Sequence, residues 1–193
     1  MAGPVLILVR HAQTGANAGG LLQGRDDLEL TEAGLAQAKA LAAALTPAVV
    51  VSSPLLRARQ TAEAFSIPVI VDERWVELDY GELDRMAIRD VPPSVWQRWR
   101  ADPAWAPAGG ESLVDVGARV REACDELAAQ AVDQDVVVVS HVSPVKAAVA
   151  WALGVGDDVV WRLFLDVAAV TRIRVPAEGT PILVSYNEVA HLR

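Results

Sequence analysis

Two runs of branched apolar residues, each leading into a histidine, dominate the hydrophobic pattern of the chain. The first is Val5-Leu6-Ile7-Leu8-Val9, which is followed by Arg10 and His11. The second is Val136-Val137-Val138-Val139, which is followed one residue later by His141. Continuous apolar runs of this length are typical of strands buried on both faces of a parallel sheet. The pattern therefore predicts two buried strands whose carboxyl ends each present a histidine.

The remaining elements are predicted from helical apolar spacing, capping residues and shorter apolar runs. Thr31 is expected as a helix N-cap, and Ser53 as another, with Pro54 at the first helical position. Ser112 with Asp115 three residues later resembles a capping box at the start of a long helix. The expected helices span about 31–45, 54–65, 112–130 and the stretch from 143 onward, and the further strands 48–51, 67–71, 168–175 and 181–186.

Alternation of strands and helices predicts an α/β fold, a three-layer sandwich with a mostly parallel central sheet and helices on both faces. The composition changes from Pro92 to Pro107, where Trp96, Trp99 and Trp105 occur among arginines and prolines. We interpret residues of about 84–110 as a small helical cap inserted into a single domain covering residues 1–193. The tryptophans are expected mainly to pack the cap, although one of them could also touch a substrate.

Composition narrows the classes of partner. The 193 residues are 52% hydrophobic and 22% charged, and the formal net charge of −8 argues against nucleic acid and anionic membranes as partners. A local cluster of arginines could still bind a small anion. The lone Cys124 fits a reducing compartment, and the chain shows neither a targeting segment nor an apolar run long enough to span a bilayer. We therefore expect a cytoplasmic protein.

The polar residues at the predicted strand ends suit phosphoryl transfer. Open α/β sheets bind ligands beyond the carboxyl ends of their strands, where Arg10, His11, Arg57 and His141 would meet. Arginine binds phosphate oxygens bidentately, and a neutral histidine can attack phosphorus. A second, protonated histidine could stabilise charge on the phosphate oxygens. The departing alkoxide also needs an acid, for which Glu77 is the leading candidate, with Asp79 and Glu82 nearby.

These residues lie in motifs that resemble the histidine phosphatase superfamily, which includes the cofactor-dependent phosphoglycerate mutases. The matching blocks follow the family order over about residues 5–150. They are Arg10-His11-Ala12-Gln13-Thr14 with Asn17, then residues 23–34, 52–62, 77–81 and 109–112, and Val138-Val139-Ser140-His141.

The resemblance implies a role for each residue of the site. His11 would be the phosphorylated nucleophile, Glu77 the proton donor, and no metal or cofactor would be needed. The implied phosphate ligands are Arg10, Asn17, Arg57 and His141 together with His11, and Thr14, Gln23 and Gly24 are expected to contact substrate.

Two positions depart from the family pattern. Ala12 replaces a glycine, and its methyl group would crowd the phosphate loop if the backbone there needs a positive φ or a close approach. Asp84-Arg85 replaces the usual Glu-Gly after the acid-bearing turn.

The resulting prediction is a phosphomonoesterase, an acid-type histidine phosphatase that hydrolyses a small phosphorylated metabolite. A mutase is the first alternative, but the short cap favours hydrolysis, because mutases must keep a phosphoenzyme away from water. The second alternative is a non-catalytic protein that binds a phospholigand, motivated by Ala12 and Asp84-Arg85. The sequence carries no signal for an oligomeric state.

Overall fold

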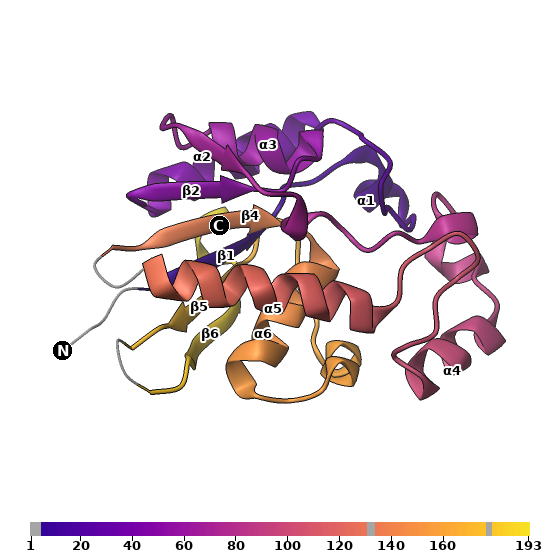
Figure 1. Ribbon diagram of the computed structural model, residues 1–193. Helices are drawn as coiled ribbons and strands as arrows, with labels where there is room; N and C mark the ends of the chain where they lie inside the picture. The colour runs from indigo at the N-terminus through magenta and orange to yellow at the C-terminus, as the bar shows by residue number, and fades with distance from the viewer. Residues whose placement is uncertain (1–4, 131–133, 177–178) are drawn as a thin grey trace.

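A six-stranded sheet forms the centre of the computed structural model, which describes residues 5–130, 134–176 and 179–193 (Figure 1). The strands are β1 (Val5–Arg10), β2 (Val49–Ser52), β3 (Val69–Val71), β4 (Val136–Ser140), β5 (Val170–Arg174) and β6 (Ile182–Glu188), in the spatial order β3-β2-β4-β1-β5-β6. The pairs β3–β2, β2–β4 and β4–β1 are parallel, whereas β1–β5 and β5–β6 are antiparallel. The predicted α/β fold with a mostly parallel sheet is confirmed.

Helices cover both faces of this sheet. They are α1 (Gly15–Gly19), α2 (Glu32–Ala44), α3 (Leu56–Glu63), α4 (Pro93–Ala101), α5 (Leu113–Gln130) and α6 (Val142–Leu153), with 3-10 turns η1 (Glu73–Trp75), η2 (Gly81–Leu83), η3 (Ile88–Asp90), η4 (Asp157–Arg162) and η5 (Ala190–Leu192). Leu6 and Leu8 of β1 pack in the cluster that contains α5 and α6. Ile7 and Val9, which alternate with them, pack in the cluster that contains α2 and α3. The unbroken apolar run of β1 therefore arises because both faces of the strand are covered.

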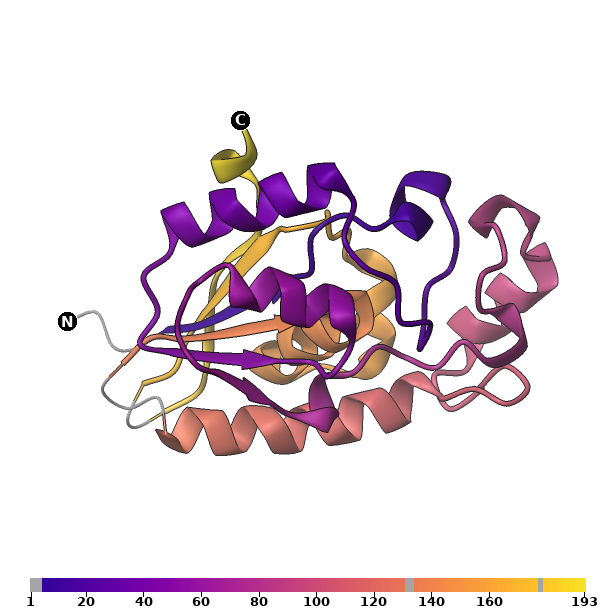
Figure 2. The ribbon, with the colours of Figure 1, turned by 90° about the horizontal axis from the view of Figure 1, so that it is seen from above.

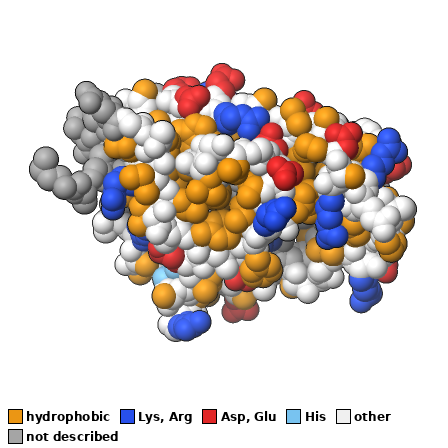
Figure 3. All heavy atoms as spheres, turned by 90° about the horizontal axis from the view of Figure 1, so that it is seen from below, with side chains coloured by type: hydrophobic (Ala, Val, Ile, Leu, Met, Phe, Trp, Pro, Cys, Tyr) orange, Lys and Arg blue, Asp and Glu red, His pale blue; other side chains and the backbone are white. Residues whose placement is uncertain are grey.

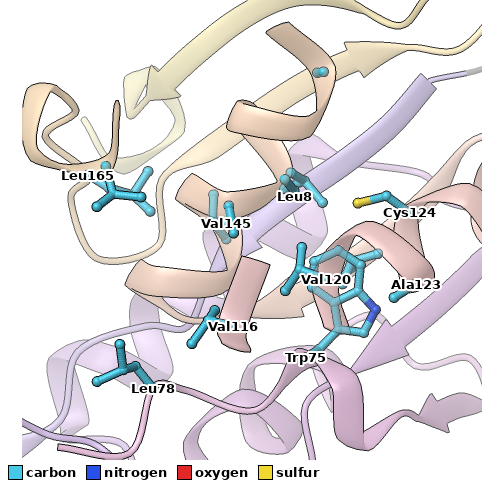
Figure 4. Packing of buried hydrophobic residues seen from close by; sticks show 14 of the residues in the cluster. Leu8, Trp75, Leu78, Val116, Val120, Ala123, Cys124, Val145 and Leu165 are labelled. Atoms are coloured by element: carbon cyan, nitrogen blue, oxygen red, sulfur yellow. The ribbon is translucent and has the colours of Figure 1, made fainter. Parts of the chain in front are cut away.

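The larger of the two clusters is organised around Trp75, whose side chain is completely buried. Figure 4 shows the indole of Trp75 beside Val120 and Ala123 of α5, with Leu8 of β1 and Cys124 close by. Ser140 at the end of β4 donates a hydrogen bond of 2.6 Å from its hydroxyl group to the carbonyl oxygen of Trp75. This packing fixes the chain just ahead of residue 77 against the end of a central strand.

The cap predicted near residues 84–110 contains α4, which lies at the edge of the molecule beyond the ends of the strands (Figures 1 and 2). Trp99 is buried, and its ring stacks on Trp96 at a centroid distance of 5.9 Å. Trp105 and Trp161 make edge contacts with the ring of Trp99 at 5.6 and 5.8 Å. The tryptophans of the cap therefore pack against one another as expected. Trp161, which belongs to η4 and not to the cap, joins this group.

A short antiparallel contact joins the start of the cap to the segment that follows α1. The backbone N–H of Leu22 donates to Met86, and that of Arg85 donates back to Leu22, both at 2.9 Å. The N–H of Ile88 also donates to Gly20 at 2.9 Å. Residues 20–22 and 85–88 are thus held together by backbone hydrogen bonds.

The predicted start of α3 is wrong. The helix begins at Leu56 rather than at Pro54, and its N-cap residue makes no side-chain cap hydrogen bond. Asp27 instead accepts the N–H of Leu56 at 2.5 Å, and the Ser53 hydroxyl lies 2.7 Å from the ring of His141. A serine that suits a helix cap by sequence is used here to hold a buried imidazole.

One face away from the strand ends carries exposed apolar side chains. Figure 3, in which the molecule is seen from below, shows hydrophobic side chains gathered on this face. Leu153 of α6 and Ile182 and Val184 of β6 are exposed. Ile182 pairs with Arg174, which pairs with Val5, so it lies at the end of the sheet opposite His11. Within the described residues, no helix has the length and apolar character needed to cross a membrane.

A substitution at Gly34, in the first turn of α2, tests how tightly this helix packs on the loop after β1. A Cβ at Gly34 would lie 2.2 Å from the carbonyl oxygen of Gln13. We expect Gly34→Ala to lower the free energy of unfolding by about 1–3 kcal/mol, because backbone must move. Gly15→Ala is the matched control, because a Cβ there meets nothing within 4 Å. Equal urea denaturation midpoints for the two variants would contradict the packing described.

Candidate active site

Neighbouring strand ends bring the sequence-predicted residues together. Arg10 is in register with Ser140, and Ser52 is in register with Val139. The residues that follow these strands therefore meet at one edge of the sheet, as the sequence predicted. The rings of His11 and His141 are 5.1 Å apart between centroids, at an angle of 58°.

His11 is buried and its hydrogen bonds define one tautomer. Its Nδ1 lies 2.7 Å from the carbonyl oxygen of Ala12, which can only accept, so Nδ1 carries the proton. The Nε of Arg57 donates to Nε2 of His11 at 3.2 Å, so Nε2 presents a lone pair. Burial lowers the pKa of His11 well below 6.5, and the charges of Arg57 and Arg10 lower it further. The imidazole is therefore a neutral base with its lone pair on Nε2.

Backbone carbonyl groups hold Arg57 beside Nε2 of His11. Its side chain is completely buried, and its two terminal nitrogens donate to the carbonyl oxygens of Asp26 and Gly24, each at 2.8 Å. Burial lowers its pKa from 12.5 to about 10, although nearby acidic groups, Glu77 first among them, favour the charged form. The guanidinium remains a cation at neutral pH and is fixed in place.

His141 follows β4 and is completely buried. Its Nε2 lies 2.7 Å from the hydroxyl oxygen of Ser53, which also accepts the N–H of Leu55 at 3.3 Å. Its Nδ1 is buried and has no hydrogen-bond partner in the described part of the chain. Burial lowers its pKa well below 6.5, followed by the effect of Arg57.

Thr14 orients two amide side chains. Its backbone N–H donates to Oδ1 of Asn17 at 3.0 Å, and its hydroxyl oxygen lies 2.6 Å from Oε1 of Gln23. The amide oxygens are thereby occupied, and the NH2 groups remain as donors. Gly24 contributes through its backbone, because its carbonyl oxygen accepts a hydrogen bond from Arg57. The position also needs glycine, because a Cβ there would lie 2.9 Å from the carbonyl oxygen of Leu78.

Glu77 lies at the amino end of α6, and it forms no side-chain ion pair with another described residue. Its Oε1 accepts the N–H groups of Leu78 at 2.8 Å and Ser143 at 3.1 Å, and its Oε2 accepts the N–H of Val142 at 3.0 Å. The carboxyl group is buried, whereas Glu82 is exposed, and Asp79 is bonded to the N–H of Gly81 at 2.9 Å. Of the three acidic candidates, only Glu77 reaches the cavity described next.

A cavity of about 330 Å³ opens at this strand edge and extends to the cap. Of the sequence-predicted residues, those that line it are Arg10, His11, Asn17, Gln23 and Glu77. Arg57, His141, Thr14 and Gly24 are not lining residues but lie next to residues that are. Arg57 and Thr14 are hydrogen-bonded to His11 and Gln23, the His141 ring lies 5.1 Å from that of His11, and Gly24 is bonded to Arg57.

Sequence analysis missed other lining residues, namely Ser143, Lys146, Trp161 and Phe164. Lys146 follows Ser143 by three residues on α6, so the helical repeat places both on one face. This spacing, together with the position of α6 after His141, could have indicated that Lys146 lies near the site. Trp161 and Phe164 belong to the segment around η4, whose sequence carries no motif.

Several buried side-chain nitrogen atoms of the site have no hydrogen-bond partner in the described part of the chain. They are Nε of Arg10, Nε2 of Gln23 and Nδ1 of His141. A buried donor without an acceptor costs about 1–3 kcal/mol, so this arrangement favours binding of an anion with several oxygens. Among the described residues, no group of three or more His, Cys, Asp or Glu side chains could hold a metal ion.

The two departures from the family pattern have structural explanations. Ala12 has no positive φ, and it is buried in the cluster beneath α2. Its methyl group therefore packs in the core and does not crowd the loop after β1. Arg85 does have a positive φ, 67°, where the family usually has glycine. Its backbone N–H donates to Leu22, and its guanidinium pairs with Asp26, which holds the unfavourable conformation.

Known proteins resemble this chain over nearly its full length. A family model described as "Histidine phosphatase superfamily (branch 1)" matches residues 6–189, which confirms the resemblance drawn from the motifs. Phosphoserine phosphatase 1 of Hydrogenobacter thermophilus is 36% identical over 198 residues, covering 97% of this chain and 93% of that protein. A phosphoserine phosphatase mutant from Entamoeba histolytica, solved in complex with phosphoserine, has a TM-score of 0.91 at 25% identity and covers 98% of this chain and 100% of that chain.

A bifunctional protein of Mycobacterium tuberculosis is 35% identical over 198 residues, covering 97% of this chain and 54% of that protein. The chain thus spans about half the length of this relative.

The depressed histidine pKa values lead to a titration test. We expect both His11 and His141 to stay neutral down to pH values well below 6.5, because burial and the nearby arginines disfavour their cations. Nitrogen-15 chemical shifts of the rings, followed from neutral to acid pH, report this directly. The same titration in urea supplies the unfolded reference. A midpoint at or above 6.5 for either ring contradicts the environment described.

The bond between Ser53 and His141 gives a second test. Ser53→Ala removes the hydroxyl group at Nε2 and leaves that ring nitrogen buried without a partner. We expect the free energy of unfolding to fall by about 1–3 kcal/mol and the nitrogen-15 shifts of His141 to change. Ser52→Ala is the control, because that hydroxyl donates only to the neighbouring carbonyl oxygen of Ser53. If His141 shifts equally in both variants, Ser53 does not set its state.

Proposed function

Because the chain belongs to the histidine phosphatase superfamily, we propose that it hydrolyses phosphomonoesters through a covalent phosphohistidine on His11. The observation that carries this proposal is the neutral His11, with its Nε2 lone pair held by Arg57 among buried donors without partners. A phosphate group would give these donors acceptors, and its charge would offset the buried cations. The names of the related phosphatases support the same reaction.

In the first step, Nε2 of His11 attacks phosphorus while the bond from phosphorus to the ester oxygen breaks. Nδ1–H stays bonded to the carbonyl of Ala12, so the ring keeps its orientation as charge develops on it. The Nε–H group of Arg57, which donates to Nε2 of His11 before the reaction, then donates its hydrogen bond to a phosphate oxygen instead. The Ser53 hydroxyl donates to His141, so that Nδ1–H of His141 is a further donor for the phosphate.

Glu77 completes this step as the proton donor. Its Oε1 already accepts two backbone N–H groups, while Oε2 accepts one, so we assign the transferred proton to Oε2. That proton passes to the departing alkoxide. In the second step the Glu77 carboxylate takes a proton from water as the water attacks phosphorus, and the bond to His11 breaks. Inorganic phosphate leaves, and both side chains return to their starting states.

Substitutions of the two reacting groups test this mechanism. We expect His11→Ala to abolish turnover of p-nitrophenyl phosphate and to remove the acid-labile label trapped from a phosphorus-32 ester. Glu77→Gln should lower kcat by about 10²–10⁴-fold for alkyl esters, which need a proton at the leaving oxygen. Glu82→Gln is the matched control, because that side chain is exposed outside the cavity.

The same assays separate the competing functions. Interconversion of 2- and 3-phosphoglycerate with negligible hydrolysis would identify a mutase instead. Phosphate binding without label or turnover would identify a binding protein. Retention of label or turnover in His11→Ala would overturn the assignment of the nucleophile.

A further inference from the structure

The cavity has a reactive end and an apolar part. Beyond the residues assigned to phosphate chemistry, the cap contributes Ile88, Trp96 and Trp99, and the segment around η4 contributes Trp161 and Phe164. None of these side chains carries a charge. Trp96 meets Trp161 edge to face at 6.1 Å, and the guanidinium of Arg100 lies 5.6 Å from the centroid of the Trp161 ring. The indole rings are therefore fixed by their neighbours before any ligand arrives.

Two of these apolar side chains are exposed although they line the cavity. Phe164 keeps 72% of its surface accessible and Ile88 keeps 49%. Exposed large apolar side chains that gather at one concave site mark a surface that a ligand covers. A phosphate group alone cannot cover them, so the contact must come from the rest of the ester.

The charges in the cavity do not suit a cationic leaving group. Its lining holds two cations, Arg10 and Lys146, and one carboxyl group, Glu77, which accepts three backbone N–H groups and carries a proton before the proposed first step. An ammonium group would therefore meet cations and find no available carboxylate. Lys146 donates to the carbonyl oxygen of Val160 at 3.1 Å, and burial raises the pKa of Tyr80, so that hydroxyl stays neutral.

We propose that the leaving group of the substrate is apolar and ring-bearing, and that it packs against Phe164, Ile88 and the fixed indoles of Trp96 and Trp161. This inference rests on the phosphatase activity proposed above and specifies its substrate class. It separates this chain from relatives whose printed names refer to phosphoserine, because the alcohol of that ester carries an ammonium and a carboxylate group.

Three esters that share a primary two-carbon alcohol test the preference with the full chain. They are 2-phenylethyl phosphate, 2-aminoethyl phosphate and 2-carboxyethyl phosphate, which differ only in the group at the second carbon. We expect kcat/KM for the phenylethyl ester to exceed both others by at least about tenfold. The intrinsic reactivity of the aminoethyl ester is not lower, so this order would reflect binding in the cavity.

Phe164→Ala localises the effect. It should raise KM for 2-phenylethyl phosphate by about three- to tenfold and reduce the ratio of kcat/KM between the phenylethyl and aminoethyl esters. Because Phe164 is largely exposed, the variant should fold. Leu35→Ala is the matched control, since Leu35 is an exposed apolar residue outside the cavity, and it should leave the ratio as in the parent.

The outcomes distinguish this inference from the proposed function. Equal or better use of the aminoethyl or carboxyethyl ester, or an unaltered ratio in Phe164→Ala, overturns the apolar leaving group while hydrolysis stands. If none of the esters is turned over, the phosphatase proposal fails. Calorimetric binding of the three esters to His11→Ala then still decides the preference, which is overturned unless the phenylethyl ester binds most tightly.

Discussion

The buried guanidinium of Arg57 is the constraint on which the site depends. A cation taken out of water must find acceptors, and this one takes the carbonyl oxygens of Gly24 and Asp26 and the lone pair of His11. These contacts fix the loop after α1, the start of α3 and the imidazole in one arrangement. They also hold His11 neutral, since a protonated ring could not accept from an arginine. One desolvated charge thereby constrains both the shape of the loop after α1 and the protonation state of His11.

The sequence predicted the parts of the site that depend on strand ends. The apolar runs before His11 and His141 predicted two buried strands, and the pairing of β1 with β4 brings the two histidines together where these strands end. The roles of Ser53 and Lys146 could not be predicted in the same way. A serine before a proline suits a helix cap on local grounds, and only the fold shows that an imidazole competes for its hydroxyl group.

The aromatic part of the cavity was the least predictable, and for a related reason. Trp96 lies in the cap and Trp161 in η4, more than sixty residues later, and neither position carries a motif. Their contact depends on how the chain returns after α6. Ala12 and Arg85 show that a departure from a motif cannot be judged from the sequence alone. At these two positions its effect depends on the local backbone geometry. The methyl of Ala12 fills space in the core, while Arg85 keeps a left-handed backbone that its partners hold.

The backbone hydrogen bonds between residues 20–22 and 85–88 mean that the cap is not an independent lid. The loop that they anchor continues directly into Gly24 and Asp26, whose carbonyl oxygens hold Arg57. Any outward swing of the cap would pull on this loop and disturb the alignment of the guanidinium with His11. Under the proposed function, this loop would couple recognition of the alcohol beneath the cap to the alignment of Arg57 with His11.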